Sequence, residues 1–71
     1  MGMKSLNLRQ AIIERVKGKS EEQLSEVIQD SIGADERALP GLGVLFEIIW
    51  QNIDDATQQQ LVSSLSHHLE Q

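Results

Sequence analysis

Residues 42–53 carry apolar side chains around most of a helix, and this limits how the chain can fold. At about 100° per residue, these side chains cover roughly two thirds of the helix circumference. The clearly polar strip is narrow and consists of Gly43, Glu47 and Gln51. A helix this apolar must be enclosed on more than one side, so the sequence predicts a central helix at this position.

The rest of the chain also spaces its apolar residues like helices, and no segment alternates as an exposed strand does. Asn7, Ser20 and Asp54 are suited to cap helix starts, and Gly18 and Gly33 are suited to end helices. We therefore predict one all-α domain over residues 1–71, a compact bundle of about four short helices with a central apolar third helix. The predicted helices span about 8–17, 21–32, 40–52 and 55–69.

One apolar stripe on each helix is expected to face a common core. This predicted core consists of Leu8, Ile12, Val16, Leu24, Val27, Ile28, Ile32, Leu42, Leu45, Phe46, Ile49, Trp50, Leu61, Leu65 and Leu69. For 71 residues and 7.9 kDa, the folded surface should be about 4,400 Å². Apolar burial and lost conformational entropy nearly cancel at this size, so a lone monomer should be marginal. Any apolar face left over should bind a second copy or another molecule.

Val44 and Ile48 lie apart from the main stripe of the third helix, which contains Leu42, Phe46 and Ile49. Two interpretations remain open for this side of the helix. The two side chains pack against the first and fourth helices inside the monomer, or they form an interaction face for a homodimer or a protein partner.

Gly41 and Gly43 occupy the start of the predicted third helix, where each costs about 1 kcal/mol relative to Ala. Glycines at a helix start can bind phosphate, but here no strand precedes them and no Lys lies nearby. We expect instead that they allow a neighbouring helix backbone to approach closely.

The titratable side chains give no pattern typical of catalysis or metal binding. His67 and His68 are adjacent, so on a helix they point about 100° apart and cannot both bind one ion. A helix start explains Asp54 and Asp55, and Glu47 is expected on the solvated side of the apolar helix. The absence of Cys excludes a thiolate zinc site and a thiol nucleophile. We expect no enzymatic activity, no metal, no cofactor and no small-molecule substrate.

The charge balance disfavours nucleic acid and anionic membranes as partners. Six Lys and Arg stand against eleven Asp and Glu, which gives a net charge of −5. All six basic residues precede position 38, so the later helices lack the Arg and Lys of a DNA-recognition helix. No uncharged run approaches the roughly 20 residues of a membrane span, and no signal peptide is recognisable, so we expect an intracellular protein.

Two blocks of the sequence resemble the small acid-soluble spore protein I family of endospore-forming bacteria. The longer block is Leu-Pro-Gly-Leu-Gly-Val-Leu-Phe-Glu-Ile-Ile-Trp at residues 39–50, and the shorter is Leu-Asn-Leu-Arg-Gln-Ala at residues 6–11. The resemblance extends over about residues 6–69. It implies a minor protein of the forespore and spore core with no associated enzymatic activity and no assigned molecular role. We predict a structural or protein-interaction role. A DNA-associated spore protein and an adaptor for one partner protein remain the alternatives.

The composition also accounts for solubility in acid. Below about pH 2 all the carboxylates should be protonated. The six Lys and Arg and the two His then give a charge of +8. Such a charge opposes aggregation of a small chain, so acid solubility follows from composition and indicates no particular function.

Overall fold

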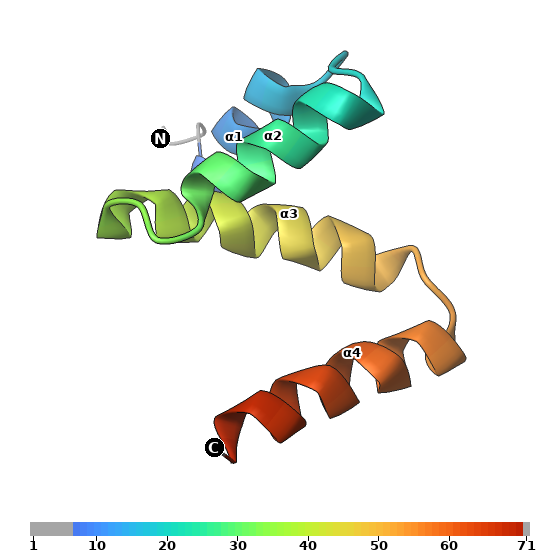
Figure 1. Cartoon of the computed structure of the whole chain (residues 1–71). Helices are drawn as coiled ribbons and strands as arrows, with labels where there is room; N and C mark the ends of the chain where they lie inside the picture. The colour runs from blue at the N-terminus through green and yellow to red at the C-terminus, as the bar shows by residue number, and fades with distance from the viewer. Residues whose placement is uncertain (1–6, 71) are drawn as a thin grey trace.

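The computed structural model describes residues 7–70 and shows an all-α fold with four helices and no strand in that range (Figure 1). The all-α helical fold predicted from the sequence is confirmed. The observed bounds differ from the predicted ones by at most one residue. The helices are α1 Leu8–Val16, α2 Glu21–Ser31, α3 Leu39–Gln51 and α4 Asp55–Leu69, with a short 3-10 helix η1 Glu36–Ala38 before α3.

Side-chain caps explain where three of the helices begin. The Asn7 side chain accepts a hydrogen bond from the backbone N–H three residues on, at 2.7 Å. Ser20 and Gln23 form a reciprocal capping box, with N···O distances of 3.2 and 2.9 Å. Asp54 accepts a hydrogen bond from the Thr57 N–H at 3.0 Å. Each cap satisfies a backbone donor that the first helical turn leaves without a partner.

Glycines end the first two helices, as predicted. Gly18 has φ 85° and Gly33 has φ 76°, a left-handed conformation that a side chain with a Cβ adopts only at a cost. The prediction for Gly41 and Gly43 was wrong. A Cβ added at either position meets no atom within 4 Å, so no close approach of a neighbouring helix requires a glycine there.

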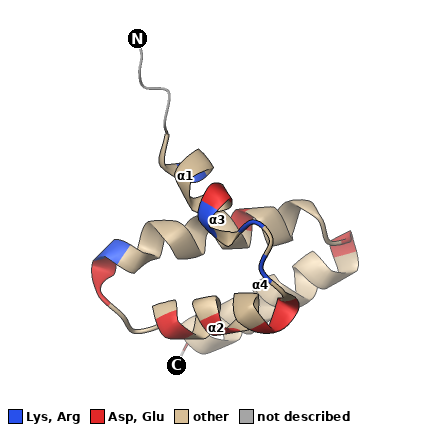
Figure 2. Cartoon of the chain, turned by 90° about the horizontal axis from the view of Figure 1, so that it is seen from above, with Lys and Arg blue, Asp and Glu red and all other residues tan. Residues whose placement is uncertain are grey.

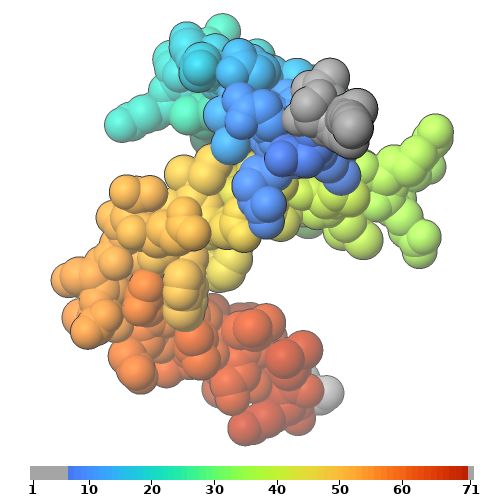
Figure 3. Space-filling model, turned by 180° about the vertical axis from the view of Figure 1, so that it is seen from behind, coloured from blue at the N-terminus to red at the C-terminus, as the bar shows by residue number. Residues whose placement is uncertain are grey.

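Helix α3 is the central element of the fold. It contacts α1, η1 and α2 on one side, whereas α4 follows a short turn and lies on the other side (Figures 1 and 3). Val44 of α3, with 9% of its surface exposed, is the only buried residue in the range 7–70. Because α4 lies on the opposite side of α3, we assign this burial to the packing of α3 against the first two helices.

The predicted core is only partly covered. Nine of its residues are half-buried, namely Ile12, Val16, Leu24, Val27, Ile28, Leu42, Leu45, Trp50 and Leu61. The other six are exposed, namely Leu8, Ile32, Phe46, Ile49, Leu65 and Leu69. The prediction was wrong for these six because helical spacing identifies the apolar side of a helix and not the neighbour that covers it.

The molecule is more open than a single domain of its mass. The chain exposes 5887 Å², against the roughly 4,400 Å² expected from the area rules. Its radius of gyration is 14.3 Å, against about 11 Å for a compact chain of this length. Within residues 7–70, the apolar sides of α3 and α4 contribute to this extra surface.

Candidate functional site

An open apolar groove separates α3 from α4. The open space measures about 790 Å³, whereas voids in packed interiors rarely exceed the size of a water molecule. The two helices therefore face each other without interlocking. The groove is lined by Gly43, Phe46, Glu47, Trp50 and Gln51 of α3 and by Leu61, Val62, Ser64, Leu65 and His68 of α4.

The turn between the two helices holds one end of the groove. Gln58 Nε2 donates a hydrogen bond to the Trp50 carbonyl at 2.9 Å, which ties the first turns of α4 to the end of α3. Asn52 Nδ2 donates to the Ile48 carbonyl at 2.8 Å and completes the end of α3. From this turn the two helices diverge (Figure 1). The two helix backbones are therefore tied together at the turn and lie farther apart toward the C-terminal end of α4.

The only two aromatic side chains of the chain, Phe46 and Trp50, both line this groove. They lie one helical turn apart, with ring centroids separated by 5.7 Å and planes tilted by 39°. Phe46 is 50% exposed and Trp50 is half-buried. Aromatic side chains contribute disproportionately to binding surfaces, so we treat this side of α3 as the candidate site.

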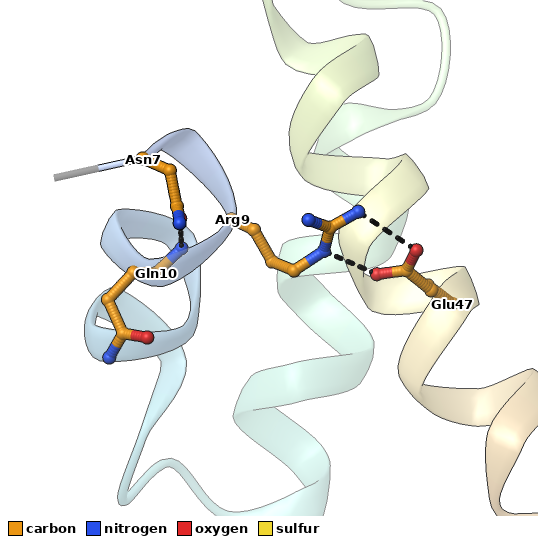
Figure 4. A network of polar contacts seen from close by, with 4 residues as sticks. All are labelled: Asn7, Arg9, Gln10 and Glu47. Carbon is orange, nitrogen blue, oxygen red and sulfur yellow. Dashed lines mark hydrogen bonds and ion pairs between the residues drawn. The ribbon is translucent and has the colours of Figure 1, made fainter. Parts of the chain in front are cut away.

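An ion pair fixes α3 against α1 beside the groove. Arg9 Nε and an Nη atom donate to the two carboxylate oxygens of Glu47, at 2.7 and 3.0 Å (Figure 4). This hydrogen-bonded pairing raises the pKa of Arg9, and the Arg9 guanidinium lowers the pKa of Glu47. The pair joins the two sequence blocks that resemble the spore protein family. Glu47, expected on the solvated side, keeps 41% of its side chain exposed and is also bound to another helix.

Several of the remaining titratable groups that the structure describes take part in local contacts. No three His, Asp or Glu side chains of that range lie close enough to hold a metal ion. His68 Nδ1 lies 2.8 Å from the Ser64 carbonyl, and the two histidine rings meet edge to face. Asp54 acts as a helix cap, and its hydrogen bonds from Thr57 lower its pKa.

The predicted interaction face of Val44 and Ile48 is not the apolar face that the structure leaves open. Val44 is buried, so of the two interpretations the structure favours packing inside the monomer, and the interaction face is corrected for this residue. Ile48 is 38% exposed, and its role in an interaction stays a prediction. The open side of α3 is instead the one with Phe46 and Trp50. Sequence reasoning missed it because these two aromatics were assigned to a core that α4 was expected to complete.

A second hollow lies between α1, α2 and the start of α3. Its lining includes the basic side chains Arg15, Lys19 and Arg37. Arg37 is paired with Asp35 at 3.1 Å within the chain, and acidic side chains run along the neighbouring α2 (Figure 2). The basic groups therefore do not form the continuous positive surface that phosphate binding requires.

Together these features define a small all-α protein with an open apolar groove and two aromatic side chains in it. The profile of one family, described as "Small, acid-soluble spore protein I", matches residues 6–69. The chain belongs to this family, and the resemblance noted in the sequence is confirmed.

Relatives carrying that description match nearly the whole chain. Proteins of Bacillus mycoides (strain KBAB4) and Bacillus cereus (strain G9842) are each 46% identical over 66 residues, which cover 92% of this chain and 96% of the relative. A protein of Bacillus anthracis (strain CDC 684 / NRRL 3495) is 44% identical over the same coverage. No solved structure matches the chain. Among residues 7–70, none of the helices combines the length and hydropathy of a membrane span.

Proposed function

We propose that this chain is a non-enzymatic component of the spore core that acts by binding protein through the groove between α3 and α4. Its membership in a spore protein family supports the proposed location in the spore. The exposed apolar lining of the groove, with Phe46 and Trp50 on one side and Leu65 on the other, supports the mode of action. Exposed apolar surface of this kind is costly in water and is typical of a binding site.

A photo-crosslinking amino acid at position 65 tests this function in spores. Leu65 is 59% exposed on the groove side of α4, so the replacement should leave the fold intact and give covalent adducts with protein. The matched control is position 32, since Ile32 is 66% exposed and lies at the end of α2, away from the groove. Absence of adducts from position 65, or equal adducts from both positions, would contradict the function. Fractionation of the same spores tests whether the protein is located in the spore core.

The alternative role, association with DNA, makes a different prediction. Binding of DNA by basic side chains weakens steeply as salt rises and is strongest at low salt. The net charge of −5 and the pairing of Arg9 and Arg37 with carboxylates disfavour it. A mobility shift at about 50 mM salt would support this alternative, and we expect none.

A further inference from the structure

We propose that the groove between α3 and α4 binds a second copy of this chain, which enters with the apolar side of its own α4. This inference deepens the proposed function and rests on it, because it identifies the chain itself as the protein bound at the groove. Four observations carry it: the exposed area, the charges around the groove, its shape, and the sequence of α4.

The exposed apolar area approaches what a stable dimer needs. Phe46 and Val62 are each 50% exposed, Leu65 is 59% exposed and Leu69 is 74% exposed. With their half-buried neighbours they present on the order of 500 Å² per copy, and a standard interface buries about 800 Å² per partner. The polar rim, which includes Gln51 and Ser64, can supply the remainder.

The charges around the groove permit two copies to meet. Each copy has a net charge of −5, so copies repel unless the contact face lacks unpaired charge. The carboxylate that lines the groove, Glu47, is already bound by Arg9 of the same chain. The acidic residues Glu21 and Glu22 belong to α2, which lies on the far side of α3 from α4 (Figure 1). A strongly charged partner would therefore find no complement here, whereas a second uncharged apolar helix would.

The shape of the two helices suits a two-fold contact. Such a contact uses one surface twice, so that surface must offer both a ridge and a hollow. The ridge is the side of α4 with Leu65, which lines the groove, and with the exposed Leu69 one turn further on, and the hollow has Gly43 in its wall. A Cβ at Gly43 would meet nothing within 4 Å in this chain, so the space beside it is free for a side chain of the second copy. Two copies of α3 and α4 would then form a four-helix arrangement.

The sequence of α4 also indicates that this helix needs a packing partner on its apolar side. The helix has 15 residues and includes Thr57, Val62, Ser63, Ser64 and Ser66, none of which is a strong helix former. Helices of about 12–15 residues are marginal in water unless an apolar side is packed. Leu69, the last apolar residue of α4, is 74% exposed within the part of the chain that the structure describes. The second copy supplies the packing that this chain does not.

Sedimentation equilibrium of the purified full chain, from about 5 to 500 μM, tests the proposal. We expect a dimer for the natural sequence and a monomer for Leu65→Glu, with a dissociation constant raised at least about 100-fold. The matched control Ile32→Glu changes an equally exposed apolar residue outside the groove and should remain a dimer. A natural chain that stays monomeric over the whole range overturns the proposal, as does equal weakening by the two variants.

Two further measurements keep the outcome interpretable. The melting temperature of the natural chain should rise with concentration, and that of Leu65→Glu should not. If circular dichroism shows that Leu65→Glu is unfolded, Leu69→Glu in the last turn of α4 takes its place. A monomer in solution that forms adducts with other proteins in spores from position 65 overturns the second copy and leaves the proposed function intact. A dimer in solution without adducts in spores supports the second copy and contradicts the proposed function.

Discussion

The two sides of α3 are similarly apolar and are covered very differently. On one side Val44 is 9% exposed beneath the first two helices, and Arg9 reaches across from α1 to bind Glu47. On the other side Phe46 is 50% exposed, although α4 follows directly in the chain. Adjacency in sequence therefore does not produce packing by itself. The covered side has contributions from three elements, whereas the open side has one helix tied to α3 near the turn.

The substitution Val44→Asp should have the largest effect, because it places a charge at the one buried position in residues 7–70. An unpaired buried carboxylate costs at least about 3 kcal/mol, enough to unfold a chain of marginal stability. The matched change Phe46→Asp, on the open side of α3, should cost less than about 1 kcal/mol in the monomer. Urea unfolding of dilute samples measures both. Similar losses for the two variants would show that the two sides of α3 are equally covered.

The next largest difference should come from removing helix caps, because α2 packs against α3 whereas α4 has little packing. Ser20→Ala breaks the capping box of α2, which contacts α3, and should lower the free energy of global unfolding by about 1 kcal/mol. Asp54→Ala removes the cap of α4, and the loss should remain local because α4 has little packing. Amide hydrogen exchange in dilute solution checks this: only the α4 amides should exchange faster in Asp54→Ala. Faster exchange throughout the chain would mean that α4 unfolds together with the other helices.

Gly43→Ala should stabilise the monomer. Gly43 lies inside α3, and the added Cβ meets no atom within 4 Å. The gain in helix propensity is about 0.5–1 kcal/mol, which should raise the melting temperature by several degrees. Gly18→Ala is the control, because its φ of 85° makes the same added methyl group unfavourable. A lower melting temperature for Gly43→Ala in dilute solution would indicate a close contact at that position within one chain.

The smallest effect on stability should come from the ion pair between Arg9 of α1 and Glu47 of α3, which is lost in acid. Arg9 holds the pKa of Glu47 below its ordinary value of 4.5, so the unfolded state takes up the proton first. This contribution to stability is complete above about pH 4.5 and is lost as the pH falls through the lower folded value. Asp35 and Asp54 act in the same direction below their ordinary value of 3.8.

Variants of the ion pair isolate the part due to Glu47. Glu47→Gln and Arg9→Ala should each make the free energy of unfolding less dependent on pH below about pH 4.5. The double variant should add no further change, because both substitutions remove the same interaction. Chemical unfolding at a series of pH values gives the curves. Unchanged pH dependence in either single variant would show that the pair does not persist in solution.

The helices could be predicted from sequence, whereas the packing of the helices could not. Caps such as Ser20 and stops such as Gly18 act within a few residues, so local sequence specifies where α1 and α2 begin and end. The Arg9–Glu47 pair joins residues 38 positions apart, and nothing local indicates it. The angle of a side chain around α3 likewise follows from the sequence, but the identity of the facing helix does not. For that reason Val44 was left open between the monomer interior and an interaction face, while Phe46 and Leu65 were assigned to the core.

The Arg9–Glu47 contact has a further consequence for the chain in a drying environment. Both side chains are partly hydrated, with exposures of 59% and 41%, so surrounding water screens their attraction. Loss of that water lowers the local dielectric constant and strengthens the attraction between guanidinium and carboxylate. The apolar groove has the opposite dependence, because its tendency to be covered comes from water itself. Dehydration should therefore strengthen the ion pair between α1 and α3. It should also remove the hydrophobic driving force for covering the groove.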